Sequence, residues 1–282
     1  MNKNETYRYP VALTIAGSDS GGGAGIQADI KTFSALGVFA TSAITAITAQ
    51  NTQGVRSIQP VSPDVLRDQI EAVLEDFTVD AIKIGMLYSA EAAHVVADTL
   101  ARYPDIPIVL DPVMISTSGS KLLKEDAIRT ITERLFPMTT LLTPNIPEAE
   151  ELSGVKIQNE EDITAAARVL RELGCRSVLV KGGHLSGSEA TDWLFIEEEK
   201  PMRLVEPRVE TRNTHGTGCT LSSAIAAYLA LSISFEFAVR LGKTYVNKAI
   251  ANGAGIEVGH GHGPVNHLFH PSPLHKIILG YE

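Results

Sequence analysis

The segment with the clearest chemical signal covers residues 213–219, and an uncharged, Ala-rich helical pattern follows it at once. Its two glycines, Gly216 and Gly218, let the backbone turn so that several N–H groups point at one place. A helix that begins there adds the positive end of its dipole to the same place. The segment therefore predicts an anion-binding site with the thiol of Cys219 at its rim.

The start of a helix lowers the pKa of a cysteine, so Cys219 is expected to be a thiolate or a proton acceptor. An ordinary glycine turn before a buried helix, with a small apolar cysteine inside it, would give the same pattern. On this segment alone the two interpretations are level, and the rest of the chain has to separate them.

The composition limits the possible partners. The chain has 282 residues, enough for one large α/β domain, and a net charge of −9. This charge argues against nucleic acid or an anionic membrane surface as the main partner, since both favour a basic protein. It leaves room for a small anionic ligand, because a local anion site can overcome the global field.

The expected compartment is the cytoplasm. Two cysteines, Cys175 and Cys219, form neither a zinc pattern nor a disulfide framework, which favours a reducing compartment. The polar first ten residues lack the apolar region of a signal peptide. The uncharged run 216–235 is rich in Ala, Ser and Thr, which favours a helix buried against a sheet over a membrane span.

Strand patterns alternate with helical patterns along the chain. The expected strands cover residues 11–16, 43–49, 81–86, 108–110, 141–143 and 177–180, with an antiparallel hairpin at 192–197 and 202–205. The expected helices cover residues 26–36, 63–77 after a Ser62 cap, 90–103, 125–135, 147–152, 160–173, 218–231 and 235–251. This alternation predicts a largely parallel sheet in one domain over 1–282, with peripheral tails at 1–9 and 270–282.

Ligands of such folds bind beyond the carboxyl ends of the strands. Asp111 and Glu148 follow two strands, and a carboxylate pair can hold Mg²⁺, although a helix-capping Asp and a solvated Glu are more common. Lys181 ends another strand and could neutralise a phosphate, although an exposed lysine is the simpler explanation. The glycine run 21–25 fits neither a dinucleotide fingerprint nor a Walker loop. Together these features favour phosphoryl transfer to a small molecule without a Walker loop.

Eight ordered motifs carry a family resemblance. They read AGSD at 16–19, GGAGIQAD at 22–29, TAQN at 48–51, KIGML at 83–87, LDPVM at 110–114, TPNIPEA at 143–149, KGGH at 181–184 and NTHGTGCT at 213–220. Over about residues 10–268 the chain resembles the hydroxymethylpyrimidine/phosphomethylpyrimidine kinases of thiamine biosynthesis, a branch of the ribokinase-like superfamily.

The resemblance implies a three-layer α/β sandwich whose mostly parallel sheet is flanked by helices. It implies an ATP-using, Mg²⁺-dependent homodimer and leaves open whether K⁺ is also needed. Such kinases phosphorylate 4-amino-5-hydroxymethyl-2-methylpyrimidine and then its monophosphate. No nucleic acid or membrane partner is expected.

The resemblance also assigns roles by position. Cys219 would accept the proton of the substrate hydroxyl, while the backbone N–H groups of Gly216, Thr217, Gly218 and Cys219 stabilise charge on the transferred phosphoryl group. Gln50 would recognise the aminopyrimidine edge, since its amide has both a donor and an acceptor.

The remaining assignments complete the pocket. The pyrimidine pocket would include Gly17, Asp29, Met86 and Val113; the phosphates and Mg²⁺ would meet Asn145, Glu148, Asp111, Lys181 and Thr214. One departure concerns His260, which stands where some relatives carry a permanently charged lysine. A nucleotide or phosphate contact from this position is therefore in doubt.

Three alternatives stay open at this point. A pyridoxine or pyridoxal kinase would share the class, and Gln50 is the residue that discriminates against it. A pyrimidine-binding regulator without turnover would have no need of Cys219, Glu148 and Lys181 together. A thiol hydrolase would use Cys219 as its nucleophile and require a nearby histidine such as His215.

Overall fold

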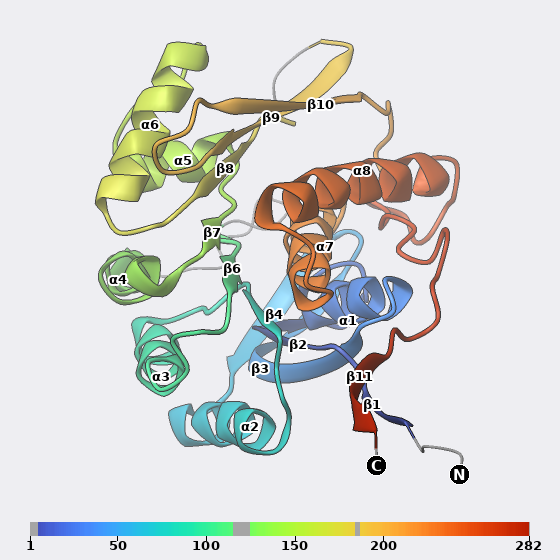
Figure 1. Ribbon diagram of the computed structural model, residues 1–282. Coiled ribbons are helices and arrows are strands. Elements are labelled where there is room, and N and C mark those ends of the chain that lie inside the picture. Colours follow the sequence, from blue (N-terminus) through green and yellow to red (C-terminus); the bar gives the residue numbers. More distant parts are fainter. Residues whose placement is uncertain (1–4, 115–124, 184–186, 282) are drawn as a thin grey trace.

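The computed structural model describes residues 5–114, 125–183 and 187–281, so His184 of the KGGH motif lies outside the described residues. A nine-stranded sheet with the order β10-β9-β8-β7-β6-β5-β2-β3-β4 runs through the molecule (Figure 1). Its strands are β2 (Val11–Asp19), β3 (Phe39–Asn51), β4 (Gly54–Pro60), β5 (Ala81–Ile84), β6 (Ile108–Leu110), β7 (Leu141–Leu142), β8 (Val178–Lys181), β9 (Glu189–Phe195) and β10 (Met202–Pro207).

The strands from β8 to β3 run parallel, whereas β4, β9 and β10 pair antiparallel at the two edges. The central strands are mostly apolar because both faces of a parallel sheet are covered, with Thr14 in β2 and Lys83 in β5 as buried polar exceptions. All four residues of β5 are buried, as are all three of β6. The carboxyl ends of the parallel strands therefore meet at one edge, where a site can form.

Helices cover both faces, which gives the three layers that the resemblance implied (Figure 1). One apolar core joins the sheet to α1 (Gly25–Ala35), α7 (Thr217–Ala230) and α8 (Phe235–Gly253). The other joins it to α2 (Pro63–Asp76), α3 (Ala90–Leu100), α4 (Glu125–Thr130), α5 (Ile146–Ser153) and α6 (Glu160–Glu172). In the part of the chain that the structure describes, no helix is long and apolar enough to cross a membrane.

Each expected strand and helix is present, with ends that differ by a few residues. The pattern expected over 125–135 is split, since α4 passes into a π-helical turn, Ile131–Leu135. Ser62 stands at the start of α2 as expected, but its side chain makes no capping hydrogen bond. The expected hairpin forms from β9 and β10.

Three strands were not expected. The edge strand β4 is mostly polar and half-exposed, so it lacks the apolar signal of the central strands. The terminal strands β1 (Glu5–Arg8) and β11 (Ile277–Tyr281) pair antiparallel with each other outside the main sheet. Their pairing joins the two ends of the chain, and alternation along one segment cannot reveal so distant a partner.

Candidate active site

The start of α7 is shaped by a close approach of two glycines. Gly216 caps the helix in the left-handed region, with a φ of 80°. A Cβ at this position would collide with the carbonyl oxygen of Gly23, so only glycine fits. The N–H groups of Gly218 and Cys219 lie in the first turn, where the helix itself supplies no acceptor.

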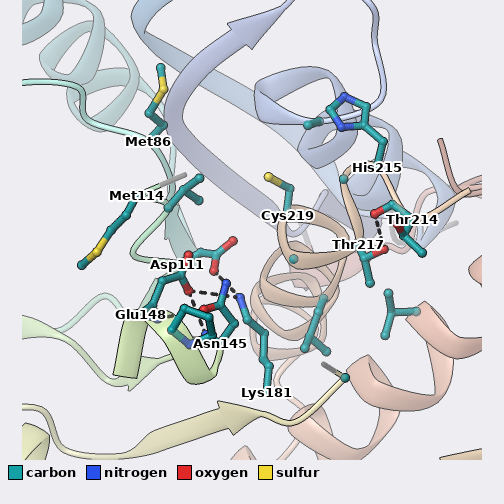
Figure 2. A pocket seen from close by; sticks show the side chains of 18 of the residues that line it. Met86, Asp111, Met114, Asn145, Glu148, Lys181, Thr214, His215, Thr217 and Cys219 are labelled. Atoms are coloured by element: carbon teal, nitrogen blue, oxygen red, sulfur yellow. Dashed lines mark hydrogen bonds and ion pairs between the residues drawn. The ribbon is translucent and has the colours of Figure 1, made fainter. Parts of the chain in front are cut away.

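Beside this helix start lies a cluster of three charged residues: Lys181 ends β8, Asp111 follows β6, and Glu148 lies in the first turn of α5 (Figure 2). Nζ of Lys181 is 2.7 Å from Oδ1 of Asp111 and 3.9 Å from Oε2 of Glu148. A Cβ placed on Gly218 would lie 3.3 Å from both Oδ2 of Asp111 and Nζ of Lys181. The fold thus brings together the anion site and the three charged side chains that the sequence had indicated separately.

Glu148 is held by the first turn of α5. Its Oε2 accepts the N–H of Asn145 at 2.8 Å, and its own N–H donates to Oδ1 of Asn145 at 2.9 Å. Burial raises the pKa of Glu148 to about 7; Lys181 opposes this shift and Asp111 adds to it. At neutral pH the carboxyl group is therefore partly protonated, and a cation that binds beside it would displace the proton.

The pKa of Cys219 corrects the expectation drawn from the helix start. Burial raises the pKa of this thiol to about 11, which Lys83 counteracts and which Asp29 and Asp111 reinforce. The backbone N–H of Gly25 at the sulfur lowers it only in part. The prediction of a lowered pKa is wrong, because burial and the charges of Asp29 and Asp111 raise the pKa more than the helix start lowers it. The thiol of Cys219 is therefore protonated at pH 7.

One cavity of about 1220 Å³ joins most of the expected site residues. Its lining includes Gly17, Gln50, Met86, Val113, Asp111, Asn145, Glu148, Lys181, Thr214, Gly216, Thr217, Gly218 and Cys219. In Figure 2, Met86 and the charged cluster lie on different sides of the thiol of Cys219. The volume suits two ligands meeting at the start of α7.

Asp29 is the exception among the expected pocket residues. It is completely buried and lies behind the cavity wall rather than in it. Its carboxylate accepts hydrogen bonds from Lys83, Thr14 and Ser223, which occupy both oxygens and hold it among the sheet and α7. The expectation that Asp29 lines the pocket is therefore corrected to a supporting position.

The sequence predicted no site role for Lys83 or for the pair formed by Asp19 and His215. Lys83 lines the cavity, and its signal was a lysine inside the otherwise apolar strand 81–84, where a buried charge needs a partner. In the pair, Oδ2 of Asp19 lies 2.9 Å from Nε2 of His215. No spacing rule connects these two residues, because they are far apart in the chain.

The same pair bears on the hydrolase alternative. The imidazole of His215 is hydrogen-bonded to Asp19, and Figure 2 shows it apart from the sulfur of Cys219. A nucleophilic thiol needs a base within hydrogen-bonding reach, so this geometry gives the hydrolase no support. His260 is not among the described residues that line the cavity.

The fold and the cavity define a class before any relative is considered. A three-layer α/β sandwich that combines a helix start, a lysine and two carboxylates in one cavity, without a Walker loop, has the parts expected of a small-molecule phosphotransferase. The chain belongs to the phosphomethylpyrimidine kinase family, whose sequence model matches residues 19–266.

Individual relatives agree with this family. The chain is 50% identical over 259 residues to a hydroxymethylpyrimidine/phosphomethylpyrimidine kinase of Rhizobium meliloti, which covers 92% of this chain and 97% of the relative. It is 48% identical over 268 residues to a thiamine biosynthesis bifunctional protein of Geobacter sulfurreducens, covering 95% of this chain but only 54% of that longer protein. The crystal structure of an ADP complex of Bacillus subtilis pyridoxal kinase is similar with a TM-score of 0.85 at 34% identity, covering 92% of this chain and 98% of that one.

Proposed function

We propose that this protein is an ATP-dependent kinase of thiamine biosynthesis. It phosphorylates the hydroxymethyl group of 4-amino-5-hydroxymethyl-2-methylpyrimidine and then the resulting monophosphate. The observation that carries the proposal is the single cavity that joins Gln50 and Met86 to Cys219, Lys181 and the start of α7. One ligand held by an amide and a second held by an anion site would meet beside the thiol.

In this mechanism the chain's own residues mainly position the reactants and neutralise charge. Gln50 binds the aminopyrimidine edge, and the N–H groups of Gly218 and Cys219 stabilise the transferred phosphoryl group. Cys219 accepts the hydroxyl proton in its thiolate form, so turnover should rise with pH toward the thiol pKa of about 11.

Two carboxylates and one ammonium group at the charged cluster fit a magnesium ion. Asp111 and Glu148 supply oxygen donors, and Lys181 neutralises only one of their two charges. The described residues contain no group of three or more His, Cys, Asp or Glu side chains that could hold a metal by themselves. Mg²⁺ is usually bound by few carboxylates together with water and phosphate oxygens, and it would neutralise charge on the phosphates.

The second candidate is a pyridoxal kinase, which the structural similarity to such an enzyme favours. The test follows ATP-dependent formation of pyrimidine monophosphate and diphosphate, with pyridoxal as the competing substrate, for the wild type and Cys219→Ala. We expect diphosphate formation, reduced by about 10²–10⁴-fold in the variant. Turnover of pyridoxal alone would assign the chain to vitamin B6 salvage.

We further propose that the protein acts as a cytoplasmic homodimer, as the family resemblance implies. Light scattering of the purified protein at micromolar concentration measures the assembly directly, and a monomer mass would contradict it.

A further inference from the structure

The amide of Gln50 has two close neighbours that determine which way it faces. Its Nε2 lies 3.4 Å from Nε2 of His215, and its Oε1 lies 3.2 Å from Oγ1 of Thr48. Half a turn of the amide exchanges the nitrogen and the oxygen while changing its shape very little. The preferred orientation therefore depends on whether each neighbour offers a hydrogen or a lone pair.

His215 offers Gln50 no acceptor at Nε2. Its Nε2 lies 2.9 Å from Oδ2 of Asp19, whose carboxylate also accepts three backbone N–H groups of the glycine-rich loop 21–24. Burial would raise the pKa of Asp19, but the hydrogen bonds from His215 and the loop lower it overall, so this carboxylate is ionised. An ionised carboxylate can only accept, so Nε2 of His215 carries the proton and acts as a donor. The single hydrogen of Nε2 points to Asp19, so Nε2 has no lone pair that could accept from the amide nitrogen of Gln50. An amide oxygen at the same place could share that hydrogen.

Thr48 offers a lone pair. Its hydroxyl donates to the carbonyl oxygen of Ser18 at 2.9 Å, a shorter distance than the 3.2 Å to Gln50. A hydroxyl has one hydrogen and two lone pairs, so a Thr48 that donates to Ser18 can still accept from a second group. Both neighbours of Gln50 therefore match an amide turned by half a turn.

We propose that Asp19 and His215 hold the Gln50 amide with its oxygen toward His215 and its nitrogen toward Thr48, which makes His215 a specificity-determining residue. This inference rests on the proposed function. The amide then presents an acceptor on the His215 side of the pocket and a donor on the Thr48 side. The amino group of the substrate pairs with the acceptor, and the adjacent ring nitrogen pairs with the donor.

This orientation also suits the reaction. On the pyrimidine ring the 4-amino group neighbours the 5-hydroxymethyl group, whereas the ring nitrogen lies farther away. His215 belongs to the loop that leads into α7, where Cys219 lies. An amino group bound on the His215 side therefore directs the hydroxymethyl group toward the helix that carries the proposed proton acceptor.

A substrate analogue with the opposite hydrogen-bonding edge tests the proposal. The 4-oxo analogue has a carbonyl oxygen in place of the amino group and an N–H in place of the ring nitrogen. Sites that hydrogen-bond a substrate can reject a mismatched one by about 10⁴-fold, so the wild type should strongly prefer the amino substrate. The measurement is the ratio of kcat/KM for the two substrates.

His215→Met removes the donor and lets the amide turn to match either edge. We expect the ratio to fall by about tenfold or more. His215→Gln, which keeps an N–H donor, should retain most of the preference. The matched control is His94→Met, the same change at an exposed position of α3, and it should leave the ratio unchanged. A His215→Met enzyme that loses activity on both substrates by the same factor would overturn the proposal.

Thr48 provides a second arm if His215→Met does not fold. Thr48→Val removes the acceptor and should also lower the ratio, whereas Thr48→Ser should preserve it. Wild-type turnover with ratios unchanged in these variants would overturn the role of His215 but not the proposed function. A wild type that does not phosphorylate the amino substrate would overturn both.

Discussion

The ammonium group of Lys83 lies 2.8 Å from a carboxylate oxygen of Asp29, and neither side chain reaches solvent. Burial alone would lower the pKa of Lys83, but the charge of Asp29 raises it overall, so the lysine stays charged. Ser223 of α7 donates to the same carboxylate at 2.6 Å. The ion pair therefore ties the centre of the sheet to the helix that carries Cys219.

Breaking this pair should strongly destabilise the protein. Lys83→Met leaves the carboxylate of Asp29 buried without its cation, which costs about 3–5 kcal/mol. Denaturant unfolding measures the loss. The double variant Asp29→Asn/Lys83→Met removes both charges and should be more stable than Lys83→Met alone; equal stability of the two would contradict this account.

The thiol of Cys219 should react slowly near neutral pH. With a pKa raised to about 11 by burial, its alkylation by iodoacetamide should accelerate about tenfold per pH unit from pH 8 and level off near the pKa. Peptide mapping separates Cys219 from Cys175, which is buried in the core. A rate already at its plateau at pH 8 would show that the free protein holds a thiolate.

Glu148 should make the protein less stable as the pH rises. Its pKa is about 7 when folded and near 4.5 when unfolded, so its contribution to stability is complete below pH 4.5 and is lost as the pH rises through 7. Glu148→Gln stays neutral and can still accept the N–H of Asn145. At pH 8 it should unfold with a free energy roughly 1–3 kcal/mol higher than the wild type, whereas at pH 4 the two should coincide.

The same variant should lose activity, because a neutral amide holds Mg²⁺ less well than a carboxylate. Turnover measured against magnesium concentration gives the apparent affinity for the metal. A Glu148→Gln enzyme with wild-type magnesium dependence would remove this residue from the proposed metal site.

Gly216 should tolerate no side chain. Gly216→Ala brings a Cβ against the carbonyl oxygen of Gly23 and strains a backbone with a φ of 80°, which alone costs about 1–2 kcal/mol. We expect lower thermal stability and a fall in kcat, since the start of α7 has to move. Gly255→Ala is the control, because a Cβ there meets no atom within 4 Å. Equal effects of both substitutions would contradict a special role for Gly216.

Gln50 should separate the two candidate substrates. Gln50→Met keeps the size of the side chain but removes the donor and the acceptor that fit an aminopyrimidine edge. The value of kcat/KM should therefore fall more for the aminopyrimidine than for pyridoxine. Losses of the same size for both substrates would refute this basis for discrimination.

Much of the fold was predictable from local patterns. The central strands are mostly apolar, and the flanking helices repeat apolar residues at helical spacing, so both elements carry their own signal. The polar edge strand β4 and the terminal pair β1 and β11 carry no such signal. Their position depends on partners far away in the chain.

The site divides in the same way. Types and spacing alone indicated Cys219 at a glycine-rich helix start and Asp111, Glu148 and Lys181 at strand ends, because a parallel sheet gathers these ends at one edge. Sequence could not show that burial raises the pKa of Cys219, that Asp29 lies behind the cavity wall with Lys83, or that Asp19 fixes His215 beside Gln50. Desolvation and hydrogen-bond partnership depend on distances between residues remote in the chain, and only the folded structure sets those distances.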